Sequence, residues 1–120
     1  MIYGIGCDII EIERIAKMDA RFLEKHFTKA EQELFEKKKH PQTVAANFAA
    51  KEAVSKALGT GVRGFSLIDV EVLRDEMGKP YINLYGDAKE LLKNKGIGEI
   101  FVTLSHSKEL AMAYVVLEKE

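Results

Sequence analysis

The first residue whose type suggests chemistry is Asp8, which follows a short apolar segment containing Gly4 and Gly6. One interpretation is structural: the carboxylate caps the helix that follows it, or is solvated in a turn. The other is functional, because Mg²⁺ binds one or two protein carboxylates and keeps waters and substrate phosphates as its remaining ligands. Position alone leaves both interpretations open.

A second group of charged residues lies in the segment 43–58, which is otherwise rich in alanine. Glu52 and Lys56 are four residues apart, so on a helix they share one face, and Lys51 lies beside them. Such a triplet is usually a solvated surface with an ordinary ion pair. The alanines indicate a largely buried helix, which favours charges that line a cleft. A carboxylate for a metal ion and a lysine for phosphate oxygens would form a compact site.

Two loops give weaker signals for anion binding. The loop Gly59-Thr60-Gly61 is either a helix cap with a turn, or a loop whose backbone N–H groups approach an anion. The glycine-rich motif of the phosphate loop is absent. The segment Ser105-His106-Ser107-Lys108 is either a polar turn or an anion pocket of hydroxyl, imidazole and ammonium groups. A serine–histidine nucleophile is disfavoured there, because neighbours along a strand point to opposite faces.

The elements that must position these residues follow from the hydrophobic pattern. A strand over residues 1–9 places Gly4, Gly6 and Asp8 on one face, where two glycines suit the close approach of another element. The expected strands are 1–9, 66–73, 80–85, 99–105 and 110–117, and the expected helices are 11–18, 21–26, 28–39, 43–58 and 87–95. Antiparallel hairpins with segregated helices favour an α+β fold, with helices packed on an antiparallel sheet, over a doubly wound sheet.

Several helix boundaries have local signals. Thr28 and Glu31 fit a capping box at the start of the helix 28–39, and Pro41 is expected to stop that helix. Gly59 suits the end of the helix 43–58, and Asp87 is expected to cap the helix 87–95.

Composition limits the classes of function. The chain has 120 residues, 47% apolar and 31% charged, which fits a single domain over residues 1–120 and excludes a disordered chain. The net charge of −1 does not suit binding along a nucleic acid duplex. No apolar run approaches the roughly 18 residues of a membrane span. A single cysteine, Cys7, excludes an internal disulfide. We therefore expect a soluble protein of the reducing cytoplasm that binds neither nucleic acid nor membrane.

Several of these segments resemble, in order and spacing, the small bacterial holo-acyl-carrier-protein synthases of the 4′-phosphopantetheinyl transferase superfamily. The resemblance covers most of the chain. Its motifs are Gly4-Ile-Gly-Cys-Asp8-Ile-Ile-Glu11 with Arg14, Phe27-Thr28, Phe48-Ala-Ala-Lys-Glu-Ala53, Ser55-Lys-Ala-Leu-Gly-Thr-Gly61, Gly78-Lys-Pro80 and Leu104-Ser-His-Ser107. The run from Phe48 to Ala53 is the most specific of them.

The resemblance implies transfer of 4′-phosphopantetheine from coenzyme A to a serine of apo acyl carrier protein, with release of adenosine 3′,5′-bisphosphate, in support of fatty acid synthesis. It implies that Asp8 and Glu52 hold Mg²⁺ on the diphosphate. The other implied contacts are Lys56 with diphosphate oxygens, Gly59, Thr60 and Gly61 with the nucleotide, His106 and Lys51 with the 3′-phosphate region, and Arg14 and Arg21 with the carrier protein. It also implies a homotrimer with each site between two subunits.

One position departs from the family pattern, and one alternative function stays open. Family members often carry arginine immediately before Phe48, where this chain has Asn47, which can donate a hydrogen bond but bears no charge. A phosphate contact at that position would be weaker. The serine nucleophile belongs to the partner, and a water, or Glu52 acting through one, is the expected proton acceptor. The alternative is a non-catalytic module that binds acyl carrier protein or a nucleotide, which would not need the Asp8–Glu52 pair.

Overall fold

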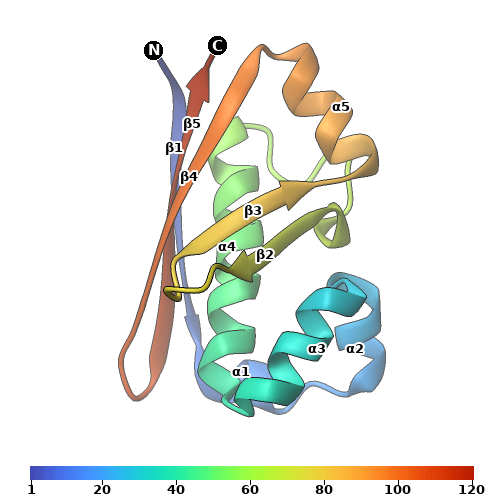
Figure 1. Cartoon of the computed structure of the whole chain (residues 1–120), viewed down its shortest axis with the longest axis vertical. Helices are drawn as coiled ribbons and strands as arrows, with labels where there is room; N and C mark the ends of the chain where they lie inside the picture. Colours follow the sequence, from blue (N-terminus) through green and yellow to red (C-terminus); the bar gives the residue numbers. More distant parts are fainter.

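The computed structural model describes all 120 residues, in which one strand is followed by four helices and then by two pairs of strands separated by a helix (Figure 1). The strands are β1 (Ile2–Glu11), β2 (Val70–Arg74), β3 (Pro80–Leu84), β4 (Ile97–His106) and β5 (Leu110–Lys119). The helices are α1 (Ile12–Ala16), α2 (Ala20–His26), α3 (Lys29–Lys38), α4 (Pro41–Leu58) and α5 (Gly86–Asn94), with a short 3₁₀ turn at Leu67–Asp69.

The strands form two antiparallel groups. Strands β1, β5 and β4 make a three-stranded sheet in that order, and β2 pairs with β3 in a separate hairpin. In the larger sheet Asp8 lies opposite Ala113, which in turn lies opposite Leu104. Strands β1 and β4 are therefore the two edges of the sheet. With helices packed against these antiparallel strands, the α+β prediction is confirmed.

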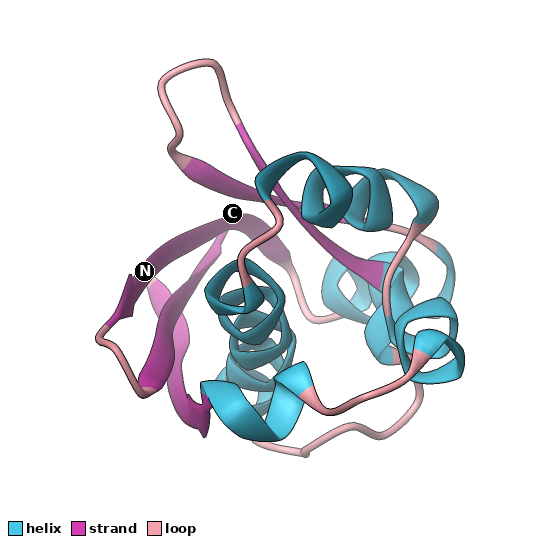
Figure 2. Ribbon diagram, turned by 90° about the horizontal axis from the view of Figure 1, so that it is seen from below, coloured by secondary structure: helices cyan, strands magenta, loops and turns pink.

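Helix α4 is the axis of the molecule and packs directly on the larger sheet. Figure 2, which looks along α4, shows the strands near the two termini on one side of it and other helices on the opposite side. A Cβ atom at Gly4 would collide with the carbonyl oxygen of Ala57, and one at Gly6 with that of Ala53. The glycines on the inner face of β1 thus permit the close approach that their spacing predicted.

The core has an aliphatic end and an aromatic end. Its 25 buried apolar side chains include the alanines of α4 and the inward side chains of β5, among them Val115 and Leu117. At the other end, the edge of the Phe27 ring meets Phe35 with the ring centroids 5.0 Å apart. This aromatic contact joins the start of α3 to its own last turn. None of the helices has the length and apolar character required to span a membrane.

Some helix boundaries differ from the predictions. Pro41 begins α4 as well as following α3, because a proline is favoured in the first turn of a helix, where no N–H bond is lost. Asp19 accepts a hydrogen bond from Phe22 N and starts α2, so the helix predicted for 11–18 shrinks to five residues. Asp87 lies inside α5 and makes no cap, since Tyr85 occupies the cap position. The capping box at Thr28 is confirmed.

Candidate active site

Asp8, Glu52 and Lys56 come together between β1 and the C-terminal half of α4. Asp8 lies on the inner face of β1, half-buried, and its Oδ1 atom accepts a hydrogen bond of 2.9 Å from Lys56 Nζ. A Cβ atom at Gly6 would lie 3.1 Å from Lys56 Cβ, so the glycine two residues before Asp8 allows this side chain to cross the strand. Glu52 is half-buried one helical turn before Lys56.

The electrostatics of this group favour the binding of a further cation. The pKa of Glu52 is raised, first by burial and then by the negative charge of Asp8, while Lys56 and Arg14 oppose the shift. The hydrogen bond to Asp8 is the main cause of the raised pKa of Lys56. A carboxylate whose charge is destabilised by a neighbouring carboxylate is a favourable place for a bound cation, which removes the repulsion.

The donor set fits a magnesium ion that is shared with a substrate. No group of three or more histidine, cysteine, aspartate or glutamate side chains is arranged to hold a metal. Two carboxylates are nevertheless what Mg²⁺ needs when waters and phosphate oxygens complete its coordination.

The loop after α4 borders a cavity with two further cations. Gly59 ends the helix with φ of 82°, and Gly61 has φ of 71°, so both residues adopt the left-handed conformation that glycine tolerates. A cavity of about 440 Å³ is lined by Gly59, Thr60, Arg63, Leu91 and Lys95. Arg63 and Lys95 had no motif in the sequence that marked them for this cavity.

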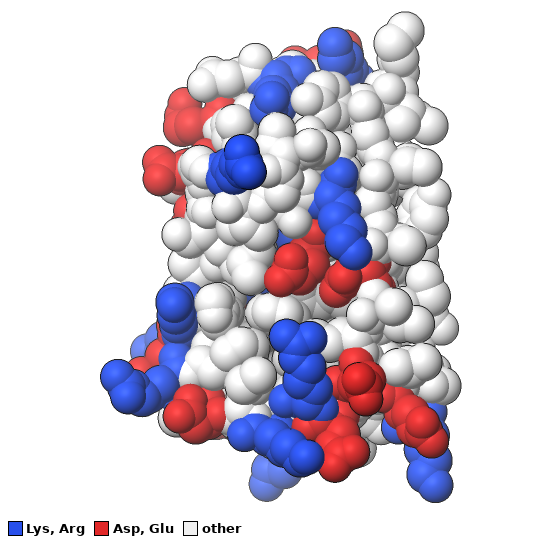
Figure 3. Space-filling model, turned by 180° about the vertical axis from the view of Figure 1, so that it is seen from behind, with Lys and Arg blue, Asp and Glu red and all other residues white.

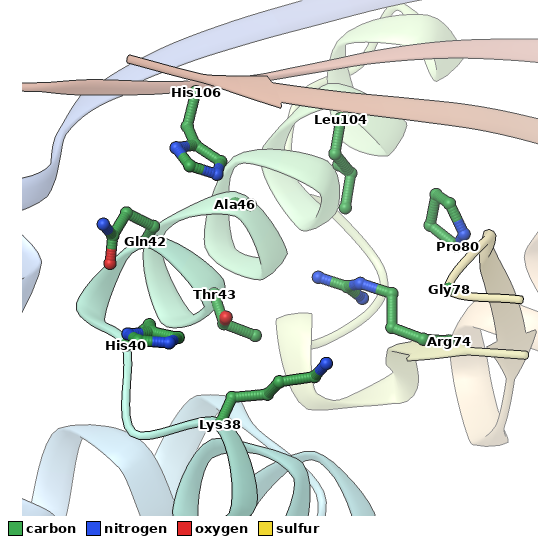
Figure 4. A pocket seen from close by; sticks show the side chains of 10 residues that line it. All are labelled: Lys38, His40, Gln42, Thr43, Ala46, Arg74, Gly78, Pro80, Leu104 and His106. Carbon is green, nitrogen blue, oxygen red and sulfur yellow. The ribbon is translucent and has the colours of Figure 1, made fainter. Parts of the chain in front are cut away.

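His106 lies apart from the carboxylates. It ends β4, at the opposite edge of the sheet from Asp8, and borders a different cavity of about 340 Å³. The other basic residues of that cavity are Lys38, His40 and Arg74 (Figure 4). Lys38 and His40 belong to a basic run at 37–40, for which favourable charge at a helix C-terminus is a sufficient explanation in the sequence. Arg74 had no such signal.

The prediction for Lys51 is wrong. Its side chain is fully buried, and its Nζ atom donates to Glu31 Oε1 at 2.8 Å, to Leu67 O at 3.1 Å and to Val70 O. All three N–H donors of the ammonium group are therefore used inside the protein. Burial is the main cause both of the lowered pKa of Lys51 and of the raised pKa of Glu31. Lys51 is an interior cation, and it does not reach a phosphate at the surface.

Asn47 is also buried, and it connects this interior pair to the cavity at His106. Its Nδ2 atom donates to Glu31 Oε2 at 3.0 Å and to Val72 O at 2.8 Å. Its Oδ1 atom accepts a hydrogen bond of 2.8 Å from a terminal nitrogen of Arg74. The position that departs from the family pattern therefore contacts a guanidinium group from β2.

The two arginines predicted to meet a protein partner are exposed. Arg14 lies on α1 and Arg21 on α2. Arg14 is close enough to Glu52 to affect the pKa of that carboxyl group. Figure 3 shows positive side chains, interspersed with acidic ones, at the end of the molecule where α1, α2 and α3 lie. Arg14 therefore connects this surface of mixed charge to the acidic pair.

Comparison with known proteins identifies the family. The model of the 4′-phosphopantetheinyl transferase superfamily matches residues 4–115. A holo-acyl-carrier-protein synthase of Alkaliphilus metalliredigens is 53% identical, over 97% of this chain and 98% of that protein. The crystal structure of the synthase from Neisseria meningitidis has a TM-score of 0.91 at 35% identity, covering 99% of this chain and 100% of that one. The synthase from Bacillus anthracis, solved in complex with coenzyme A (3′,5′-ADP), has a TM-score of 0.85 at 41% identity, covering 100% and 99%. The chain is therefore an enzyme of the 4′-phosphopantetheinyl transferase superfamily, and it belongs to the holo-acyl-carrier-protein synthases within it.

Proposed function

We propose that this enzyme transfers 4′-phosphopantetheine from coenzyme A to a serine of apo acyl carrier protein, in a reaction that depends on Mg²⁺ and serves fatty acid synthesis. The serine oxygen forms a bond to the phosphorus that bears the pantetheine. The bond from that phosphorus to the bridging oxygen breaks, adenosine 3′,5′-bisphosphate leaves, and the serine proton passes to a base. The observation that carries this proposal is the half-buried pair Asp8 and Glu52 with Lys56 beside it.

Each of these side chains has a separate task. Asp8 and Glu52 would hold Mg²⁺, which supplies positive charge to the diphosphate as negative charge develops on the leaving group. Lys56 is exposed over 55% of its side chain, so it can turn from Asp8 towards a diphosphate oxygen. Glu52 would also take the serine proton, through a water.

The experiment that tests this function is a mass measurement. Apo acyl carrier protein is incubated with coenzyme A, Mg²⁺ and the enzyme, and its intact mass is recorded. We expect a gain of one phosphopantetheine group, and we expect EDTA to abolish the gain. An unchanged mass with several apo carriers would leave the binding module as the remaining function. A gain that persists in EDTA would refute the role of the metal.

The positions of the two cavities support a site shared between two chains. Asp8 and His106 lie at opposite edges of the three-stranded sheet, so a nucleotide that contacts both kinds of group fits better across two subunits than within one. The outer face of the sheet provides an apolar surface for such contact. In one row Ile5, Val116 and Phe101 lie side by side across the three strands, and 56% of Ile5 and 48% of Phe101 are exposed. In Figure 3 the corresponding side of the molecule is almost free of charge.

We therefore propose a homotrimer in which these sheets pack together, because contiguous exposed apolar patches mark protein interfaces. Co-refolding of Asp8→Asn and His106→Ala chains tests the shared site. Each variant alone should be defective at low coenzyme A concentration. A one-to-one mixture should regain about a quarter of its sites if each site uses two chains. No recovery in a mixture that assembles normally would place the whole site in one chain.

The exposed side chains of Arg14 and Arg21 are the proposed contact for the carrier protein. Acyl carrier proteins of this kind are expected to be acidic, so these side chains would steer association. The association rate constant should fall as salt screens the charges, with most of the loss by about 0.5 M salt. Charge reversal at Arg14 should abolish the salt dependence, whereas an unchanged rate would exclude steering. The proposal places the enzyme in the cytoplasm, where the exposed thiol of Cys7 stays reduced.

A further inference from the structure

The cavity beside His106 is positively charged and has no acidic wall. Its ten lining residues include Lys38, His40, Arg74 and His106, and none is an aspartate or a glutamate. Figure 4 shows that Lys38, Arg74 and His106 extend into it from α3, β2 and β4. Three elements that are distant in the sequence thus supply basic side chains to one space of about 340 Å³. A dianionic group such as a phosphate monoester matches this arrangement.

The guanidinium group of Arg74 is held in place by a neutral acceptor. Asn47 gives both of its N–H donors to the interior, to Glu31 and to Val72 O, so its Oδ1 atom must face Arg74. A flipped amide would place its oxygen against the Glu31 carboxylate and its N–H groups against the guanidinium group. The burial of the asparagine therefore determines where the arginine points.

Arg74 keeps donors available for a ligand. Besides the bond to Asn47, the only other hydrogen bond of its side chain is a long one of 3.4 Å to Leu73 O. A guanidinium group carries five N–H donors in a planar fork that matches two phosphate oxygens. Burial lowers the pKa of Arg74, while the negative charge of Glu31 opposes the shift. A guanidinium group nevertheless stays protonated in proteins.

We propose that Arg74, oriented by Asn47, binds the 3′-phosphate of coenzyme A, and that it replaces the arginine which family members often carry at position 47. In this chain the positive charge therefore comes from Arg74 on β2, and Asn47 on α4 supports it through a hydrogen bond. This inference rests on the proposed function, because it concerns recognition of the donor substrate.

The test compares coenzyme A with 3′-dephospho-coenzyme A as donor. In the wild-type enzyme we expect a lower KM for coenzyme A. Arg74→Gln should raise the KM for coenzyme A by about tenfold or more, which is the loss of one charge-assisted contact, and should leave the KM for the dephospho donor nearly unchanged. Arg74→Lys should retain part of the preference. Lys93→Met, which removes one exposed positive charge on α5, is the matched control and should behave as wild type.

Asn47 acts through Arg74, so it is tested as a positioning residue. Asn47→Ala should raise the KM for coenzyme A without lowering kcat, and it should have little further effect in an Arg74→Gln background. Calorimetric binding of adenosine 3′,5′-bisphosphate against 5′-AMP gives a second readout that needs no turnover. The preference for the bisphosphate should disappear in Arg74→Gln.

Equal KM increases for both donors, or an Arg74→Gln variant that keeps the preference, would overturn the inference. A wild-type enzyme that makes no distinction between the donors would overturn it as well. Absence of transfer from either donor by the wild-type enzyme would instead refute the proposed function, so the two failures are distinguishable.

Discussion

Helix α4 carries two lysines five positions apart, and each forms an ion pair with a carboxylate from another element. Lys51 lies 2.8 Å from Glu31, and Lys56 lies 2.9 Å from Asp8. The first pair has no exposed side-chain surface, whereas 55% of Lys56 and 17% of Asp8 are exposed. The distances are nearly equal, so the difference between the pairs lies in their surroundings.

The surroundings decide whether a pair serves the fold or a ligand. Every donor of Lys51 has a protein acceptor, and Glu31 also receives N–H bonds from Thr28 and Val72. Such a pair cannot exchange partners without leaving a charge buried and unpaired. Asp8 raises the pKa of Glu52, and Lys56 beside them is 55% exposed, so the best further partner of the two carboxylates is a cation from outside the chain. The ion pair whose hydrogen bonds are all made within the protein stabilises the fold. The carboxylates that lack such partners are available to bind a ligand.

The largest expected effect is a loss of stability on breaking the buried pair. Lys51→Met leaves the Glu31 carboxylate without its cation and should reduce the free energy of unfolding by about 3–5 kcal/mol. Denaturant unfolding measures this change. The double variant Glu31→Gln/Lys51→Met should lose less than the sum of the two single variants, because both charges are removed together. A loss below about 1 kcal/mol for Lys51→Met would show that the interior pair is dispensable.

The next effect is catalytic. Asp8→Asn keeps the shape of the side chain but replaces a charged ligand by a weak one, so the rate of transfer should fall roughly 100-fold or more at a fixed Mg²⁺ concentration. The melting temperature should change little, because Asp8 lies at the edge of the structure. Initial rates over a Mg²⁺ titration give the result. A variant with wild-type rate and metal dependence would remove Asp8 from the site.

Replacing Glu52 should raise the stability of the metal-free protein and remove its stabilisation by Mg²⁺. Its pKa is raised in the folded protein, so folding favours the protonated form, and that stability is lost as pH rises through the folded pKa. In EDTA at pH 7, Glu52→Gln should therefore have a higher melting temperature than wild type. The difference between the two melting temperatures should narrow in acid, as the wild-type carboxyl becomes protonated. Mg²⁺ should stabilise wild type only. A variant that melts below wild type in EDTA would contradict this.

The smallest expected effect is the stability change at Lys56. Lys56→Met makes the same substitution as Lys51→Met, five residues further along the same helix, but Lys56 is itself exposed to solvent over 55% of its side chain. The free energy of unfolding should change by less than about 1 kcal/mol. Denaturant unfolding under the same conditions allows a direct comparison. A loss as large as that of Lys51→Met would show that exposure does not separate the two pairs.

Local patterns made much of the fold predictable. The capping box of Thr28 and Glu31 and the cap at Gly59 depend on a few neighbouring residues, and both are confirmed. Gly4 and Gly6 predicted a close approach because strand periodicity places them on one face. Local patterns could not predict that Asp8 and Glu52 come together, because this depends on how β1 and α4 pack across more than 40 residues of chain.

The incorrect prediction for Lys51 and the missed role of Arg74 also arise because local patterns do not show tertiary contacts. Helical spacing places Lys51 on a face but does not say that this face meets β2 and the carboxylate of Glu31, 20 residues away. Glu31 already had a local explanation in the capping box, so nothing in the sequence marked it as the partner of a buried lysine. Arg74 resembles an ordinary charged residue at a strand end until Asn47 is brought beside it.

The most direct test of the distinction between the two pairs is the rate of transfer to acyl carrier protein per folded chain, measured for Asp8→Asn and Lys51→Met. The folded fraction comes from unfolding curves, and the rate comes from the intact mass of the carrier. We expect Asp8→Asn to be folded and nearly inactive, and Lys51→Met to be less stable but active within a few-fold of wild type for each folded chain. An active Asp8→Asn, or a stable and inactive Lys51→Met, would contradict the assignment of the buried pair to the fold and the exposed pair to the chemistry.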